Sequence, residues 1–257
     1  MNILVLGDVV SLAGCSFVRK KLPALKKLKA IDFCIANGEN SADGNGITPD
    51  SAEQLFASGI DFITTGNHVY RRKEIYTMLD DNGFIIRPCN YSGKNPGEGS
   101  KVVDCGFFNI GIINVMGTMY MENLKNPFDS VDCEIEKQKK KTNIILVDFH
   151  AEATSEKKAM GFYLDGRVSA VFGTHTHVLS ADNTVLPCGT GYITDIGMCG
   201  VKNSVLGVDK NIVIEKFRFN MPQKFDKAKG AAMINGCIFA IDKATGKCTG
   251  TELVSFE

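Results

Sequence analysis

Short apolar runs alternate with amphipathic stretches along the first 90 residues, and this alternation constrains the fold more than any other feature. The apolar runs predict buried strands at residues 3–6, 31–36, 61–65 and 84–86. The stretches between them predict helices at residues 17–29, 49–58 and 73–80. Strands that are separated by helices of this length pair mostly in parallel, as in βαβ units. The first third of the chain therefore predicts an α/β fold.

The pattern changes after residue 87. Residues 91–100 are rich in Gly, Pro, Asn and Ser and predict a loop, and residues 129–141 predict a helix. Further strands are expected at residues 101–105, 107–115, 144–149, 169–172, 191–194, 212–219, 236–241 and 249–254. We find no internal repeat and no long linker, so we expect one domain over residues 1–257, with two β layers between helices.

Composition excludes several classes of protein. Hydrophobic residues make up 44% of the chain and charged residues 23%, as in folded globular proteins. The formal net charge is zero, so no stable nucleic-acid complex is expected. The apolar start at residues 2–7 stops at Asp8 and lacks a basic leader, which predicts a cytoplasmic protein without a membrane segment. The nine cysteines show no Cys-x-x-Cys spacing and predict scattered, reduced thiols rather than a zinc site.

Residues with metal-binding or catalytic side chains follow five of the predicted strands. They include all four histidines of the chain and are Asp8, Glu39 and Asn40, Asn67 and His68, His150, and His175 and His177. Each one alone has an ordinary explanation, such as a helix cap, a turn or a hydrogen-bonded core histidine. Ligands of open α/β sheets bind beyond the carboxyl ends of the strands. The coincidence of all four histidines at such positions therefore favours a shared site.

The mixture of carboxylate, amide and imidazole groups suits borderline divalent ions such as Mn²⁺, Fe or Zn²⁺. Seven candidate ligands are too many for one open site and about right for two ions that share a bridging ligand. Two ions roughly 3.5–4 Å apart clamp a phosphoryl group and generate hydroxide near neutral pH. Two divalent ions carry four positive charges, and Asp8 and Glu39 supply two negative ones. The remaining positive charge predicts an anionic substrate.

These motifs resemble those of the calcineurin-like metallophosphoesterases. The segments Gly7–Val10, Asn37–Asn40, Asp148–Lys157 and Thr174–Val178 are most similar to the bacterial YmdB-like phosphodiesterase family. This resemblance implies a sandwich of two mixed β-sheets flanked by helices. It also implies a binuclear-metal phosphodiesterase that hydrolyses small phosphodiesters such as 2′,3′-cyclic nucleotides through a metal-bridging hydroxide. Self-association is left open.

The resemblance also assigns roles to individual residues. Glu39 bridges two metal ions, which are Fe and/or Mn, with Zn as an alternative. Asp8, Asn40 and His177 complete the coordination of one ion, and Asn67, His150 and His175 complete that of the other. His68 stays off the metals, faces the phosphate and donates a proton to the leaving oxygen. The broader superfamily opens with Asp-x-His, whereas Val10 stands at the histidine position here, and Asn40 is expected to take the vacant coordination position.

Two other functions stay open from the sequence. One is a phosphomonoesterase that acts on nucleotides or sugar phosphates, and the other is a nucleotide-binding regulatory protein with slow hydrolysis. A metallo-β-lactamase motif is absent, because Val178 and Leu179 follow His177, and no Walker phosphate loop occurs. The sequence does not identify the native metal or the physiological substrate.

Overall fold

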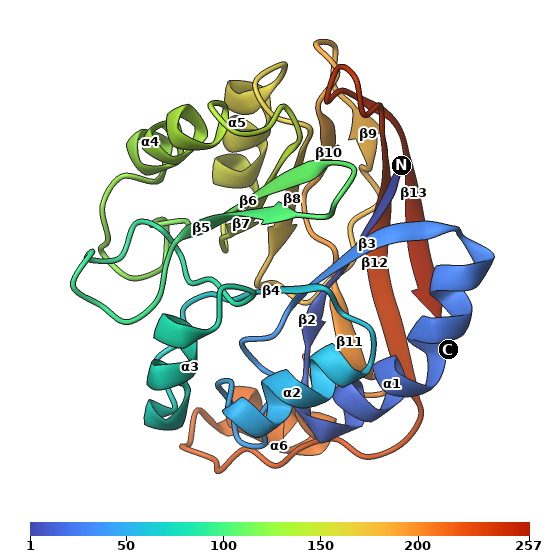
Figure 1. The fold of residues 1–257 in the computed structure, drawn as a ribbon. Helices are drawn as coiled ribbons and strands as arrows, with labels where there is room; N and C mark the ends of the chain where they lie inside the picture. The colour runs from blue at the N-terminus through green and yellow to red at the C-terminus, as the bar shows by residue number, and fades with distance from the viewer.

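The computed structural model describes residues 1–257 and shows two β-sheets packed face to face between helices (Figure 1). The first sheet has seven strands in the order β2-β11-β12-β1-β3-β4, with β13 paired to β12. Its strands are β1 (Asn2–Leu6), β2 (Asp8–Val9), β3 (Ile31–Asn37), β4 (Phe62–Thr64), β11 (Met198–Val201), β12 (Ala232–Ile241) and β13 (Cys248–Phe256). β1, β3 and β4 run parallel, and β12 runs antiparallel to its three neighbours.

The second sheet has six strands in the order β5-β6-β7-β8-β10-β9. They are β5 (Ser100–Asp104), β6 (Asn109–Met116), β7 (Ile145–His150), β8 (Ala170–Thr174), β9 (Thr184–Val185) and β10 (Gly191–Ile193). The four inner strands are parallel and both edge strands are antiparallel, so this sheet is mixed like the first. The predicted sandwich of two mixed sheets is confirmed.

Helices cover the outer faces of the sandwich, α1 and α2 on the first sheet and α4 and α5 on the second (Figure 1). The helices are α1 (Ser11–Leu28), α2 (Pro49–Ala57), α3 (Tyr76–Asp81), α4 (Pro127–Gln138), α5 (Thr154–Leu164) and α6 (Lys210–Phe219), with a 3₁₀ turn at Lys73–Ile75. None of them is long and apolar enough to cross a bilayer. Helices cover the outer face of each sheet and the other sheet covers its inner face, so the central strands are buried on both faces. This double burial explains their continuous apolar runs.

Strand β1 shows this double burial. Ile3 and Val5 belong to the core between the two sheets, where they join Phe172 of the second sheet. Leu4 and Leu6 point the opposite way and pack in the core beneath α1 and α2. Since alternate residues of a strand face opposite sides, a strand buried on both faces needs apolar residues at every position.

One predicted strand is wrong. Residues 212–219 form most of α6, not a strand. The Asp209 side chain accepts a hydrogen bond from the Asn211 backbone N–H at 2.8 Å and so caps the helix. Val213 is the only residue of α6 that is fully buried, whereas Ile214 and Phe217 are exposed. The apolar pattern predicted a buried strand, but these side chains belong to a helix that lies mostly on the surface.

Smaller differences concern weak or short elements. Residues 84–86 contribute a single parallel bridge, between Ile63 and Ile85, rather than a strand. The sequence also gave no prediction of α5, or of the short strands β2 and β11, which pair with each other in parallel. The predicted loop over residues 91–100 is irregular up to Ser100, where β5 begins.

Candidate metal centre

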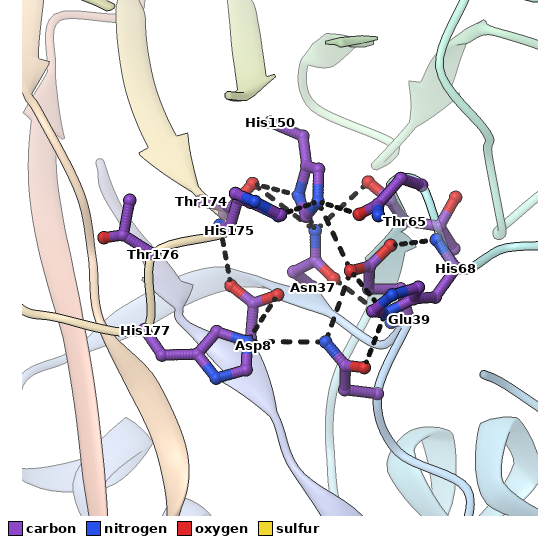
Figure 2. A network of polar contacts seen from close by, with 12 residues as sticks. Asp8, Asn37, Glu39, Thr65, His68, His150, Thr174, His175, Thr176 and His177 are labelled. Atoms are coloured by element: carbon purple, nitrogen blue, oxygen red, sulfur yellow. Dashed lines mark hydrogen bonds and ion pairs between the residues drawn. The ribbon is translucent and has the colours of Figure 1, made fainter. Parts of the chain in front are cut away.

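The carboxyl ends of strands from both sheets meet at one place, and all eight predicted site residues lie there. Three places in the first sheet contribute. Asp8 begins β2, just after β1; Glu39 and Asn40 follow β3; and Asn67 and His68 follow β4. From the second sheet come His150, the last residue of β7, and His175 and His177, which follow β8. Figure 2 shows the labelled members of this cluster pointing toward one another.

One group of the cluster gathers around His150. Its Nε2 lies 3.1 Å from Asn67 Oδ1, 3.1 Å from His175 Nδ1 and 3.3 Å from Glu39 Oε1 (Figure 2). Glu39, His150 and His175 each offer a ligand atom, and these three atoms lie within 4.8 Å of one another. This spacing suits three ligands of a single ion.

A second group lies on the other side of Glu39. Asn40 Nδ2 is 3.2 Å from Glu39 Oε1 and 3.4 Å from His177 Nε2, which is in turn 3.5 Å from Asp8 Oδ1. Glu39 therefore contacts both groups, as a bridging ligand would. The Asp8 side chain is fully buried, yet its Oδ1 accepts no hydrogen bond. A buried carboxylate oxygen without a donor is costly, and a bound cation would satisfy it.

The electrostatics of the cluster also favour cations. Burial acts to raise the pKa of Asp8 and Glu39, but the neighbouring histidines outweigh it and hold the pKa of both carboxyls below the ordinary value. Burial acts to lower the pKa of His150, but Glu39 and Asp8 outweigh it and raise the pKa of the ring to about 9. Two fully buried carboxylates thus stay ionised and demand positive charge. The donor set of oxygen and imidazole nitrogen fits the divalent ions that the fold family implies.

His68 is placed differently from the other histidines. Its backbone N–H donates to Glu39 Oε2 at 2.8 Å, and its Nδ1 lies 3.0 Å from Asn40 Oδ1. Its Nε2 lies 3.4 Å from the side-chain nitrogen of Asn45, and the ring lines an open cleft of about 550 Å³. Burial is the main cause that lowers the pKa of His68. The ring is therefore oriented through the ligand residues and remains accessible from the cleft.

The sequence reasoning missed the residues that orient His150. Thr174 Oγ1 donates to Asp148 Oδ1 at 2.6 Å, so it accepts from His150 Nδ1–H at 2.9 Å. This assignment leaves Nε2 as the ring nitrogen that lies beside Glu39 and Asn67, where it would donate its electron pair to a bound ion, the usual arrangement for a ligating histidine. Asp148 also accepts from Thr64 Oγ1 at 2.5 Å. The available signal was its spacing, since Asp148 lies two residues before His150 and on the same face of β7.

A buried ion pair that no sequence pattern indicated holds the backbone between His175 and His177. Lys157 Nζ, from α5, donates to Asp195 Oδ2 at 2.6 Å and to the Thr174 carbonyl at 2.7 Å. Asp195 Oδ2 also accepts from the Thr176 backbone N–H at 3.1 Å. His175 and His177 have φ angles of 95° and 63°, which non-glycine residues adopt only at a cost. The ion pair therefore fixes the amide between two strained residues.

Close packing against the His150 ring explains why residue 66 is a glycine. A Cβ at residue 66 would lie 2.3 Å from His150 Nε2, far inside van der Waals contact. The imidazole therefore crosses directly over the Gly66 backbone, and the motif Gly66-Asn67-His68 needs glycine at its first position.

Two mixed sheets that bring carboxylate, amide and imidazole ligands to one edge define the metallophosphoesterase fold. A putative 5′-nucleotidase from Staphylococcus aureus shares this fold, with a TM-score of 0.59 over 99% of this chain and 54% of that protein, at 14% identity. Within this class the chain belongs to the family described as YmdB-like protein, whose sequence model matches residues 4–254. The resemblance found in the motifs is thereby confirmed.

Two relatives cover nearly the whole chain. A protein from Bacillus subtilis named 2′,3′-cyclic-nucleotide 2′-phosphodiesterase is 43% identical over 254 residues, which are 99% of this chain and 96% of the relative. The crystal structure of a phosphatase from Mycoplasma pneumoniae is 35% identical and superposes with a TM-score of 0.94, covering 100% of this chain and 93% of that protein.

Proposed function

We propose that the protein is a metal-dependent phosphodiesterase that hydrolyses nucleotide phosphodiesters such as 2′,3′-cyclic nucleotides. The observation that carries this proposal is the arrangement of two ligand groups on either side of the shared carboxylate of Glu39. The Bacillus subtilis relative, which bears the name of this activity, supports the choice of substrate.

In this proposal Glu39 holds both ions, Asp8, Asn40 and His177 complete one site, and Asn67, His150 and His175 complete the other. When bound, two divalent ions lower the pKa of a water molecule and neutralise charge on the phosphoryl oxygens. Thr174 and Asp148 hold Nδ1–H of His150 and so keep this imidazole in the tautomer whose Nε2 can bind an ion. Mn, Fe and Zn all suit this donor set, so the metal is a matter for analysis of the purified protein.

The position of His68 supports the role of proton donor to the leaving oxygen, which requires the protonated ring, so the rate should fall as the pH rises through its lowered pKa. It contacts the ligand residues Glu39 and Asn40 but keeps its Nε2 on the cleft side. A positioned acid of this kind contributes about 10²- to 10⁴-fold to the rate. His68→Ala is expected to keep the metal content and to lose turnover by about that factor. Full activity of this variant would contradict the acid role.

The test of the proposed function is a comparison of diester and monoester substrates with Mn²⁺ added. We expect 2′,3′-cyclic AMP to be hydrolysed with a higher kcat/KM than 3′-AMP, and bis-p-nitrophenyl phosphate faster than p-nitrophenyl phosphate. Asn67→Ala is expected to lose one of two bound ions in elemental analysis, because it removes an oxygen ligand of one group only. Faster hydrolysis of the monoesters would favour a phosphomonoesterase, and binding of a nucleotide without hydrolysis would favour a regulatory protein.

A further inference from the structure

The cleft above the metal centre extends well beyond the residues that the proposed chemistry uses. Its volume is about 550 Å³, in the range of pockets that hold small organic ligands. Its lining includes His68, His175 and His177. It also includes two segments on either side of α6, residues 206–208 and 225–227, which we call the distal wall.

An aromatic ring is the main apolar group of the distal wall. Phe225 lines the cleft and remains 48% exposed, although it is a large apolar side chain. Lys216 Nζ, from α6, lies 4.6 Å from the centre of the ring, within the range of a cation–π contact. Lys216 itself does not line the cleft, so its ammonium group is not among the groups that a ligand in the cleft would contact.

The distal wall is anchored to the rest of the molecule. Lys227 forms an ion pair with Asp43, in the loop that follows β3. The Asp209 backbone N–H donates to the Asp226 carbonyl at 2.9 Å, and the Ala228 N–H donates to the Gly207 carbonyl at 3.0 Å, so the two segments are joined to each other. Phe225 therefore lies two residues from Lys227, which the ion pair with Asp43 holds in place.

The wall also contacts the metal centre directly. His177 Nδ1 lies 3.4 Å from the carbonyl oxygen of Leu206, and the opposite nitrogen of the ring faces Asp8. A ligand whose phosphate sits at the metal centre would thus extend toward Leu206 and Phe225 along one continuous surface.

We infer that Phe225 is a stacking platform for the nucleobase of the substrate, an assignment that rests on the proposed function. Phe225 lines the cleft beside the proposed metal centre, and an aromatic ring at such a place has the π-face needed to stack on a base. Stacking on an aromatic side chain is tolerant of base identity, because every base has a π-face. The ligand class is therefore a nucleotide phosphodiester rather than a sugar phosphate, with little discrimination among bases at Phe225.

The experiment compares 2′,3′-cyclic AMP with base-free ribose 2,3-cyclic phosphate, using the Mn²⁺-loaded full-length protein. Phe225→Ala is expected to lower the ratio of kcat/KM for the two substrates, nucleotide over base-free, by about ten- to a hundredfold. Phe225→Tyr is expected to restore most of that ratio. Phe217→Ala is the matched control, because Phe217 is an exposed aromatic residue of α6 that does not line the cleft.

A second measurement separates this inference from the proposed function. The Kd of 3′-AMP is measured by calorimetry for the wild-type protein and for both alanine variants. Weaker binding to Phe225→Ala alone supports the stacking platform, even if the wild-type protein proved to bind nucleotides without hydrolysing them. An unchanged substrate ratio and an unchanged Kd in Phe225→Ala overturn the platform and leave the phosphodiesterase proposal standing.

Discussion

Replacement of Lys157 by methionine tests how the protein holds its strained His-x-His segment. Methionine has nearly the length of lysine but no charge and no N–H group. The change removes the partner of Asp195, whose side chain is only 3% exposed, and a donor to the Thr174 carbonyl. Asp195 would keep the backbone N–H groups of Thr176 and Gly197, at 3.1 and 2.9 Å.

The magnitude follows from the burial of this pair. Removing one partner of a buried ion pair costs about 3–5 kcal/mol, because the remaining charge is left without compensation. The two remaining backbone donors to Asp195 place the expected loss near the lower end, about 3 kcal/mol. The double variant Lys157→Met/Asp195→Asn removes both charges and keeps a side-chain oxygen as acceptor. We expect it to be more stable than Lys157→Met by about 1–3 kcal/mol.

The assay is equilibrium unfolding in urea of the metal-free protein at pH 7, followed by circular dichroism. Lys26→Met is the matched control, since Lys26 and Asp61 form an ion pair of similar length, 2.8 Å, with side chains 24% and 36% exposed. A partly exposed pair of this kind contributes about 1 kcal/mol, less than a fully buried one. Burial raises the pKa of Asp195 even with Lys157 beside it. The stability deficit of Lys157→Met should therefore shrink as the pH falls, since protonation removes the buried charge.

Two results would refute the reasoning. One is a loss for Lys157→Met no larger than that for Lys26→Met. The other is a double variant as unstable as the single one, which would mean that the unpaired carboxylate is not the source of the loss. If the pair does fix the segment between His175 and His177, Mn²⁺ should also raise the Tm of Lys157→Met less than that of the wild-type protein.

Three further predictions follow from the packing and burial of the site and of the thiols. Gly66→Ala forces a methyl group against the His150 ring and should sharply reduce bound metal in elemental analysis, whereas Gly93→Ala, with no atom within 4 Å of the added carbon, should bind metal like the wild-type protein. Iodoacetamide at pH 7.5 should label Cys133 and Cys188 first, as measured by peptide mass spectrometry, because these two thiols are exposed. Burial raises the pKa of enclosed thiols such as Cys15, Cys199 and Cys237 to about 12, so rapid labelling of all nine cysteines would contradict this prediction. Removal of metal by a chelator should lower the Tm, and added Mn²⁺ should restore it, since ions that bind only the folded protein stabilise it; an unchanged Tm would count against a metal centre.

The fold class could be predicted from the sequence alone, and so could the set of polar residues that gather at the strand ends. Strands buried on both faces leave continuous apolar runs, so β1 and β3 could be located without a structure. Residues such as Asp8 and His150 stand where those runs end, and strand ends of a parallel sheet meet at one edge. Because histidine occurs only four times, its positions carried more information than those of any commoner residue.

The contacts between distant segments became known from the three-dimensional structure. Residues 212–219 have an apolar pattern, yet they form α6, which begins at the Asp209 cap and leaves Phe217 on the surface. The Lys157–Asp195 pair and the approach of Phe225 to the cleft each join segments that are far apart along the chain. A local pattern gives the positions of apolar residues and their periodicity. It does not record which partner each buried group meets, because that depends on how the two sheets pack together.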